Sequence, residues 1–589
     1  MKNMRECEKI NRIFILSVLL SVSVSLTGCG IFTIFGKAGK AEETGSPVAV
    51  MTQEPALPDT ENSPESAPGP SSDEQTPETD KPENEKEEAA AVSVNDHVID
   101  VYYLRDLKYE NAQPPHFYCI RESFSVADEY EGLKKKLEEF DGETEAELDA
   151  EFNDFGEEIA EVREMTGDDP QTEYLDYHFG VSLALMRADT KVFSFTKIRN
   201  YVSSDLLSRR IVTGYNYDTA SGRKLALTDI VTDTDALCDA VELKLSEEDY
   251  SAETFDRIFS EIDRSLKEAG NPSSESLSWT AGYEGLTFYF NTTVNYNVFS
   301  RMSGAFSVFL PYKAYPELFR EEYTKTDYAY VQDITIGSPW SEDFWIDSDK
   351  DGEYEELCVG GTTDKTGFYT SLYAGGAEYP YNELEYGTAA EVSGFLTRDT
   401  GGSYRIYIQR NLDDGVISTD VYEAAKSGIH YLDSFSGSLR YTEYDPDSFS
   451  AVYGYTFTNP QSFRICTLNL MMGRNFTTGS YRTDESGLPA ADSDYVEFDK
   501  AYYDIEPKED LRVLIVDRDG NGIEEGILKK GTAVRPYRCS ADAEENAVLD
   551  VTDTEGTIYR LEIQYDEEVF GWTFNGSEIS RYFEGLAYY

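Results

Sequence analysis

The chain has 589 residues, with 51 Lys and Arg against 112 Asp and Glu, and its formal net charge at pH 7 is −61. A surface this acidic repels the phosphates of nucleic acids and of anionic lipids, which excludes nucleic-acid binding as a leading interpretation. Apart from Cys7 and Cys29, the cysteines form an odd and sparse set without a C-x-x-C pair, which argues against a disulfide framework or a zinc site. The length allows about two to four domains.

The first 28 residues have the charge order of a secretory signal, because basic residues precede an apolar run at 13–26 that is short for a membrane span. The string Leu26-Thr27-Gly28-Cys29 resembles the lipobox of bacterial lipoproteins. This resemblance implies cleavage after Gly28 and a diacylglycerol thioether on Cys29. We therefore expect a lipid-anchored protein on the outer face of the cytoplasmic membrane, at the cell surface. The alternative is an ordinary cleaved signal.

Residues 29–93 follow as a linker. Its main part, from about 40 to 91, has no aromatic residue and is rich in Pro, Glu, Ser and Thr. Such a composition buries too little apolar surface to offset the entropy of ordering the chain. The sequence predicts a disordered acidic tether between the membrane and the folded part.

Residues 94–323 alternate strand and helix patterns, which predicts an α+β domain. Strands are expected at 98–104, 116–120, 179–186, 191–198, 210–217, 285–290 and 305–312. Apolar residues three and four apart predict an amphipathic helix over 128–165 with a break near Gly142, and further helices over 233–245 and 252–269. The long helix is expected to pack one face on a sheet.

The segments 188–195, 215–230, 285–290 and 306–312 resemble a domain of unknown function. This domain forms the extracellular, lysozyme-binding part of the sigma-V anti-sigma factor and stands beside the catalytic domain of C-type peptidoglycan deacetylases. The resemblance covers 94–323 and implies an extracellular binding domain. The stretch 203–210 reads Ser-Ser-Asp-Leu-Leu-Ser-Arg-Arg and departs from the family's small-residue pattern. The chain has neither a deacetylase domain nor a cytoplasmic domain like that of the anti-sigma factor, so only the binding domain is carried over.

Residues 324–589 show short, aromatic-rich strand patterns with Gly and Asp turns, and helical periodicity is nearly absent. This pattern predicts an all-β C-terminal domain, either a sandwich or a propeller-like array. The fold class expected for the whole chain is thus an α+β domain followed by an all-β domain.

Two acidic loops in the second domain share one spacing, at 347–355 and 517–525. Acid or amide side chains stand at positions 1, 3, 5 and 9, and glycine stands at position 6. Alternate side chains of such a loop wrap around one point, which suits a hard cation that takes six to eight oxygen ligands. The predicted calcium ligands, with the main chain of position 7 included, are Asp347, Asp349, Asp351, Glu353, Glu355, Asp517, Asp519, Asn521, Ile523 and Glu525.

The loops are not EF-hands, because Cys358 and Leu528 stand where an EF-hand has its bidentate glutamate. Apolar strand patterns flank both loops, and in this they resemble the strand-loop-strand calcium turns of integrin-type β-repeats. Ca²⁺ is therefore the expected ligand. The alternative is a pair of solvated acidic hairpin turns.

Signatures of catalysis are weak. The chain has four histidines, none with a histidine partner three to five residues away, and it has no G-x-S-x-G, Walker or dinucleotide-binding motif. Paired carboxylates could serve a glycosidase, but chance pairs are expected among 112 acids. We expect a protein that is not an enzyme.

The leading functional hypothesis is a non-catalytic cell-surface lipoprotein that binds an extracellular ligand. The ligand is expected to be a cell-wall component or a basic, lysozyme-like protein, which the charge of −61 would attract. One alternative is a peptidoglycan hydrolase or modifying enzyme with an unrecognised carboxylate site. Another is a capture or scaffold lipoprotein associated with a transporter.

Overall fold

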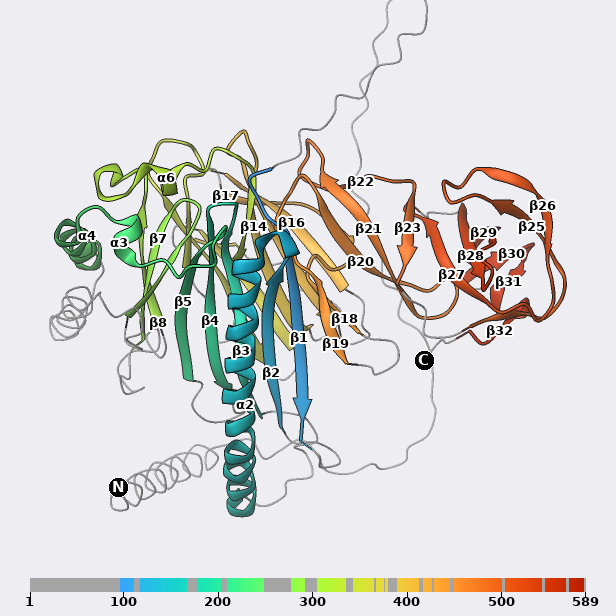
Figure 1. The fold of residues 1–589 in the computed structure, drawn as a ribbon, viewed down its shortest axis with the longest axis horizontal. Helices are drawn as coiled ribbons and strands as arrows, with labels where there is room; N and C mark the ends of the chain where they lie inside the picture. The colour runs from blue at the N-terminus through green and yellow to red at the C-terminus, as the bar shows by residue number, and fades with distance from the viewer. Residues whose placement is uncertain are drawn as a thin grey trace, which may run out of the picture. The chain divides into compact units, whose positions relative to one another are not determined.

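The computed structural model describes residues 96–110, 117–166, 177–202, 209–247, 277–291, 305–334, 343–364, 367–374, 377–379, 389–412, 417–425, 428–444, 450–499, 504–542, 546–567 and 571–586. Within these ranges the chain is mostly β-strand, and its few α-helices lie in the N-terminal part (Figure 1). No helix in the described ranges is long and apolar enough to cross a membrane. The predicted signal, Cys29 and the linker lie outside the described residues.

A seven-stranded sheet forms the centre of the N-terminal part. Its strands are β1 (Val101–Tyr109), β2 (Phe117–Val126), β3 (Tyr177–Ala188), β4 (Val192–Val202), β5 (Arg209–Asp218), β18 (Tyr441–Tyr444) and β19 (Ala451–Tyr455). Their order is β18-β19-β1-β2-β3-β4-β5. β2 and β3 are parallel and the other neighbours are antiparallel. Because Tyr102 pairs with Tyr455, two strands from beyond residue 324 complete the sheet of the N-terminal part.

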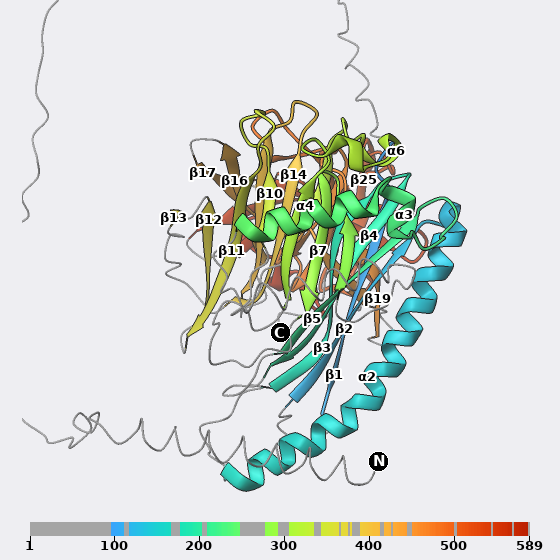
Figure 2. The same cartoon turned by 90° about the vertical axis from the view of Figure 1, so that its left-hand side faces the viewer.

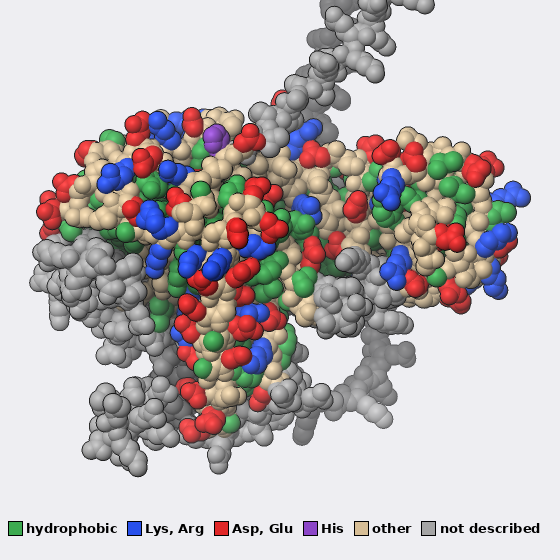
Figure 3. All heavy atoms as spheres, viewed as in Figure 1, with side chains coloured by type: hydrophobic (Ala, Val, Ile, Leu, Met, Phe, Trp, Pro, Cys, Tyr) green, Lys and Arg blue, Asp and Glu red, His purple; other side chains and the backbone are tan. Residues whose placement is uncertain are grey.

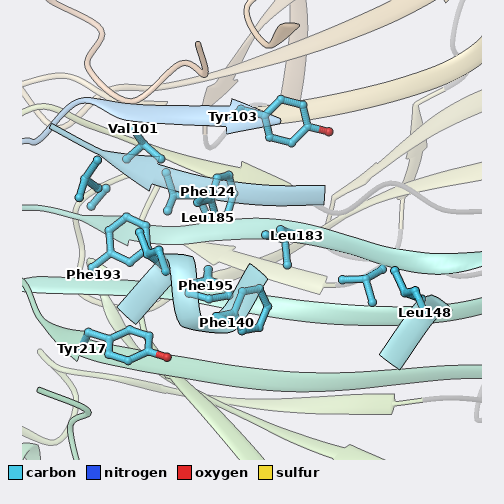
Figure 4. Close-up of a cluster of buried hydrophobic side chains, with 14 of the residues drawn as sticks. Val101, Tyr103, Phe124, Phe140, Leu148, Leu183, Leu185, Phe193, Phe195 and Tyr217 are labelled. Carbon is cyan, nitrogen blue, oxygen red and sulfur yellow. The ribbon is translucent and has the colours of Figure 1, made fainter. Parts of the chain in front are cut away.

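Helix α2 (Glu131–Thr166) connects β2 to the parallel strand β3 and runs along the sheet (Figure 2). Its apolar residues recur three and four positions apart, which gathers them on one helix face. Leu133, Leu137 and Phe140 are buried against the sheet residues Phe124 and Phe195 (Figure 4). Burying side chains of this size contributes roughly 1.5–3 kcal/mol each. The packing of this face therefore holds the helix on the sheet.

The predicted break at Gly142 is wrong, since α2 continues through this residue. An isolated glycine costs a helix only about 1 kcal/mol relative to alanine. Phe140 and Leu148, which flank it, are both buried in the core, and their packing outweighs that cost.

A second core lies between a three-stranded sheet and short helices. The sheet has the order β6 (Leu277–Ala281), β7 (Gly285–Asn291), β8 (Ala305–Pro311). The helices of this part are α3 (Leu227–Ile230), α4 (Thr234–Glu247), η2 (Pro316–Leu318) and α6 (Glu321–Thr324), whereas η1 (Asp128–Tyr130) precedes α2 and packs Tyr130 in the first core. Leu237 and Val241 of α4 pack with Leu286, Phe288 and Leu310 of the sheet. The helix predicted at 233–245 is confirmed, whereas the one at 252–269 lies outside the described residues.

Beyond residue 324 the described chain forms two further sheets before residue 440. One has the order β17 (Gly428–Ser436), β16 (Ile417–Ala425), β15 (Tyr404–Leu412), β14 (Ala389–Arg398), β9 (Tyr330–Ile334). The other has the order β10 (Asp343–Ile346), β11 (Glu355–Asp364), β12 (Gly367–Ala374), β13 (Ala377–Tyr379). The five-stranded sheet is buried on both faces, since Leu396 packs with Phe344 of β10, while the adjacent Phe395 packs with Phe457 and Phe463.

An eleven-stranded sheet forms the C-terminal part. Its strands are β20 (Phe463–Asn469), β21 (Asn475–Thr483), β22 (Pro489–Ala491), β23 (Tyr495–Phe498), β25 (Leu511–Val516), β26 (Gly522–Leu528), β27 (Val534–Ser540), β28 (Asn546–Asp553), β29 (Ile558–Asp566), β30 (Gly571–Phe574) and β31 (Ser577–Glu578). A two-stranded pair, β24 (Glu506–Pro507) with β32 (Phe583–Glu584), and the short helix η3 (Ile579–Arg581) accompany it. The sheets formed by the described residues end in free edge strands and do not close on themselves.

Candidate functional site

The first acidic loop, 347–355, is the turn between β10 and β11. Ile346 pairs with Glu355 at its base, so the loop projects from a regular hairpin. Two residues adopt left-handed backbone angles, Lys350 with φ 63° and Gly352 with φ 91°. Glycine takes this conformation freely, whereas a lysine pays about 1 kcal/mol for it. The Lys350 ammonium group donates a hydrogen bond to the Gly401 carbonyl at 2.5 Å, which helps to hold the turn.

Asp347, Asp349 and Asp351 come together within this loop. Each offers one carboxylate oxygen, and these oxygens lie within 4.8 Å of one another. Asp347 is 3% exposed, Asp349 is half-buried and Asp351 is exposed, so the group opens from the protein toward solvent. Three carboxylates at this separation repel one another. A cation placed between them would remove that repulsion.

Backbone amides of the loop fix the three carboxylates. Asp347 Oδ1 accepts from the Gly352 N–H at 3.2 Å, Asp349 Oδ1 accepts from the Asp351 N–H at 3.2 Å, and Asp351 Oδ1 accepts from the Glu353 N–H at 2.8 Å. Since an ionised carboxylate has about four acceptor positions, lone pairs are left for a metal ion. The sequence therefore predicted three residues that the structure brings together.

The other two predicted ligands of the first loop differ in position. Glu355 folds back over the loop, because its Oε2 accepts from the Ser348 N–H at 2.9 Å. Glu353 is exposed, and only its backbone N–H takes part in the hydrogen bonds of the loop. Glu355 is thus placed near the start of the loop, but it is not among the three carboxylates whose oxygens lie within 4.8 Å of one another.

Behind Asp347 lies a charged cluster that the sequence analysis missed. The Lys313 ammonium group is 3.3 Å from Asp347 Oδ2 and 3.8 Å from Glu284 Oε2. The hydroxyl groups of Tyr330 and Tyr354 donate to the two Glu284 oxygens at 3.1 and 2.7 Å. Burial and the negative charge of Glu284 both raise the pKa of Tyr354. Glu284 therefore keeps these phenols protonated as hydrogen-bond donors.

Arg398 completes this cluster, with its Nε 3.4 Å from Glu284 Oε1. Burial alone would lower the pKa of the guanidinium group, but the Glu284 carboxylate raises it. The cluster joins residues beside β7, β8, β9 and β14 to the first loop. Two loop residues contact the cluster, Asp347 through Lys313 and Tyr354 through Glu284.

The second acidic loop, 517–525, is a tighter turn between β25 and β26. Val516 pairs with Gly522, and Asp517 N–H donates to the Asn521 carbonyl at 3.0 Å. Asp517 Oδ1 accepts from the Asn521 N–H at 2.8 Å and Oδ2 accepts from the Asn521 side-chain amide at 3.1 Å. These bonds lower the pKa of Asp517 and place the Asn521 amide nitrogen, not its oxygen, toward the carboxylate.

The remaining predicted ligands of the second loop are spread along it. Asp519 is exposed, the Ile523 side chain is 63% exposed, and Glu525 lies within β26 opposite Leu514. Among the described residues, three acidic side chains converge in the first loop, and no such group of His, Cys, Asp or Glu forms in the second. The structure does not bring the second set together.

Two arginines occupy the inner side of the second loop. Arg538 donates to the Arg518 carbonyl and, at 3.2 Å, to the Asp517 carbonyl. Arg560 donates to the Gly520 carbonyl at 3.0 Å. Both guanidinium groups also bind Asp550, which is fully buried, at 2.7 Å. The two guanidinium groups therefore already bind the carbonyl oxygens that a cation in this loop would need as ligands.

Three potential catalytic groups elsewhere in the described residues, His178, Cys119 and Cys539, lie in surroundings that keep them uncharged at neutral pH. Burial lowers the pKa of His178 to about 4, and its ring stacks on Tyr118 with centroids 5.1 Å apart. Burial raises the pKa of Cys119 and of Cys539 to about 12, so both stay as thiols at neutral pH. A thiolate is the nucleophilic form of cysteine, and these two sites disfavour it.

Comparisons with known proteins are limited to part of the chain. No protein-family model matches it, and no curated protein does. A DUF3298 family structure from Bacteroides fragilis NCTC 9343 is 16% identical, covers 38% of this chain and 96% of its own length, and has a TM-score of 0.26. A DUF3298 family structure from Pseudomonas aeruginosa PAO1 is 10% identical, covers 39% of this chain and 99% of its own, and has a TM-score of 0.25.

Proposed function

We propose that this chain is a non-catalytic binding protein of the cell surface whose first acidic loop holds a divalent cation. The observation that carries the metal proposal is the convergence of Asp347, Asp349 and Asp351, with oxygens within 4.8 Å of one another. Glu355, which lies outside this group, binds the Ser348 N–H of the same loop and is the candidate fourth carboxylate. The second loop is proposed to be a hairpin turn without a metal.

Calcium is the proposed ion, because an all-oxygen ligand set on a flexible loop suits a hard cation of high coordination number. Mg²⁺ demands a near-ideal octahedral site and gives up its water reluctantly, and zinc prefers nitrogen and sulfur ligands. The four candidate carboxylates of this loop contain neither. Asp351 is exposed, which leaves room for water molecules to complete the coordination.

The test is the thermal unfolding of the full chain in Ca²⁺, in Mg²⁺ and in chelator. An ion that binds only the folded state raises stability by about 2.7 kcal/mol at a concentration one hundred times its dissociation constant. We expect Ca²⁺ to raise the midpoint well above its value in chelator, and Mg²⁺ to raise it less. Equal midpoints in Ca²⁺ and chelator would contradict the metal site.

The binding role is proposed to use the acidic outer side of α2. Arg121, Lys197 and Arg199 of the sheet pair with acids along one flank of the helix, at Glu145, Glu147 and Glu151. Acidic side chains also line the part of the helix that faces solvent (Figure 3). A basic, lysozyme-like protein would be attracted to such a surface.

Titration with lysozyme and with peptidoglycan fragments would test this role. We expect binding of the basic protein that weakens steeply with added salt, because exposed charges are screened within about 10 Å at 0.1 M. If neither lysozyme nor the peptidoglycan fragments bind, the proposed binding role is contradicted. Attachment through a lipid on Cys29, at the outer face of the cytoplasmic membrane, is part of the proposal and rests on the sequence pattern at 26–29.

We also infer that the all-β part is a layered sandwich and not a propeller. The five-stranded sheet has a buried core on each face, one with β10 and β11 and one with Phe457, Phe463 and Ile465. Sheets packed face to face in this way are the layers of a sandwich.

A further inference from the structure

A hollow in the eleven-stranded sheet lies apart from both acidic loops. Its floor is the face of the β20–β21 hairpin that carries Thr467 and Thr477, which are paired in register. Its volume is about 320 Å³, at the lower end of the range for pockets that hold small organic ligands. The described residues around it are all uncharged and include Thr467, Asn469, Leu470, Thr477, Ser540 and Trp572.

None of these described lining residues is charged, although the chain has 112 acidic residues and a net charge of −61. A bound cation or anion would lose its hydration here without a counter-charge, which costs several kcal/mol. The hollow therefore suits a neutral ligand.

The lining combines an apolar side with short polar groups. Trp572 and Leu470 supply apolar surface, and Leu470 is 57% exposed at the edge. Thr467, Asn469 and Ser540 supply hydroxyl and amide groups. Ser540 Oγ accepts from the Val548 N–H at 2.9 Å, so its own proton is available for a second partner. Thr467 Oγ1 donates to the Ser436 carbonyl at 3.3 Å, and the Asn469 amide donates to Cys539 Sγ at 3.3 Å and accepts from the Met471 N–H at 2.9 Å, so a polar ligand would add to bonds that these groups already make.

The walls of the hollow are held by packing. The Trp572 ring meets the Tyr565 ring edge-on, with centroids 5.5 Å apart. At Gly479 a Cβ atom would come within 2.6 Å of the Val496 side chain and 2.7 Å of the Tyr481 ring, so these two side chains fill the space beside the glycine. A site that is formed before binding loses less entropy when its ligand arrives.

We infer that this hollow binds a neutral sugar of one or two rings. A pyranose ring presents a C–H face that can lie on an aromatic ring such as Trp572, and hydroxyl groups at its rim that can pair with threonine, serine and asparagine. The inference rests on the proposed binding function and names a ligand class for it. Because no residue of either acidic loop takes part, its failure would leave the calcium proposal untouched.

The test is fluorine NMR of the full chain labelled with 5-fluorotryptophan, whose four tryptophans each give one signal. The chain is titrated with diacetylchitobiose and with maltose, and the Trp572 signal is assigned from Trp572→Phe. We expect a saturable shift of that signal with at least one sugar, and larger shifts with chitobiose if its acetyl methyl groups contact Leu470. No saturable shift with either sugar would overturn the inference.

Two variants separate binding from folding. Trp572→Ala lacks the reporting tryptophan, so its affinity is measured by calorimetric titration, where it should be weaker by at least about tenfold. Thr467→Val keeps the side-chain shape and removes one hydrogen bond to the sugar, so it should weaken the affinity about two- to tenfold. Its fluorine spectrum without sugar should match that of the unchanged protein, which shows that the variant is folded. The control is Trp279→Phe, which alters a partly buried tryptophan of another sheet. Unchanged affinity in both pocket variants, or an equal loss in the control, would contradict the sugar site.

Discussion

The two acidic loops share the same spacing of acids and glycine but have opposite surroundings. In the first loop, three aspartates converge and a lysine stands 3.3 Å behind Asp347. In the second, Arg538 and Arg560 bind the loop carbonyls from inside, and Asp550 holds both arginines. Carbonyls that accept from guanidinium groups have less to offer a metal ion. The sequence of a loop thus sets the shape of its turn, whereas the residues packed around it determine whether a metal ion or an arginine side chain binds there.

The largest effect is expected where the second loop depends on buried charge. Asp550→Asn would leave two buried guanidinium groups without their anionic partner, and we expect a loss of about 3–5 kcal/mol in the free energy of unfolding. Urea unfolding with and without Ca²⁺ measures it, and the loss should be the same in both. Asp504→Asn, which removes the exposed partner of Arg535, is the matched control and should cost less than about 1 kcal/mol.

The next effect separates the loops by their response to calcium. Asp347→Asn should abolish the stabilisation by Ca²⁺, about 2.7 kcal/mol at one hundred times the dissociation constant, whereas Asp517→Asn should retain it. The difference between midpoints in Ca²⁺ and in chelator is the quantity to compare, because Asp347 also accepts from Gly352 and Lys313 without metal. Loss of the calcium response in Asp517→Asn would break the contrast.

A pH effect that involves neither loop comes from His178, in the seven-stranded sheet. Its pKa is lowered to about 4 in the folded state, from an ordinary value of 6.5, so the unfolded chain binds more protons between these values. Stability from the neutral ring is complete above pH 6.5 and is lost as the pH falls toward 4, by about 3 kcal/mol. His178→Phe should flatten this part of the stability profile. The exposed His430, changed to Gln, should leave it as it is.

The smallest effect concerns the lysine behind the first loop. Lys313→Met removes an ammonium group that competes with a metal for Asp347 and is 52% exposed. A partly exposed pair of this kind is worth up to about 1 kcal/mol, so calcium affinity should rise by about fivefold at most. Calorimetric titration measures it. Lys529→Met, next to the second loop's hairpin, is the control and should leave calcium affinity unchanged; a fall in affinity for Lys313→Met would contradict the competition.

Local patterns predicted much of this fold. Period-two runs placed β1 to β5, and spacings of three and four placed α2 and α4, because these signals arise from residues that are neighbours in sequence. The helix break predicted near Gly142 was wrong, because the low helix propensity of one glycine is a weaker effect than the packing of Phe140 and Leu148. The pairing of β19 with β1 could not be predicted, because residues so far apart carry no mutual signal in a single sequence.

The same limit applies to the candidate site. Spacing alone found Asp347, Asp349 and Asp351, since a loop's geometry is local. The same spacing predicted a second calcium site at 517–525. Arg538 and Arg560 belong to β27 and β29 and reach this loop only in the folded sheet, so local spacing gave no sign of them. Lys313 and Glu284 were missed for the same reason, as they follow β8 and precede β7.

The most direct measurement is the number of calcium ions bound per chain at physiological salt, by calorimetric titration of the full protein checked with equilibrium dialysis. The contrast between the loops predicts one ion per chain, and none after Asp347→Asn. Two ions per chain, or one ion that persists in Asp347→Asn and is lost in Asp517→Asn, would contradict it, as would no binding at all.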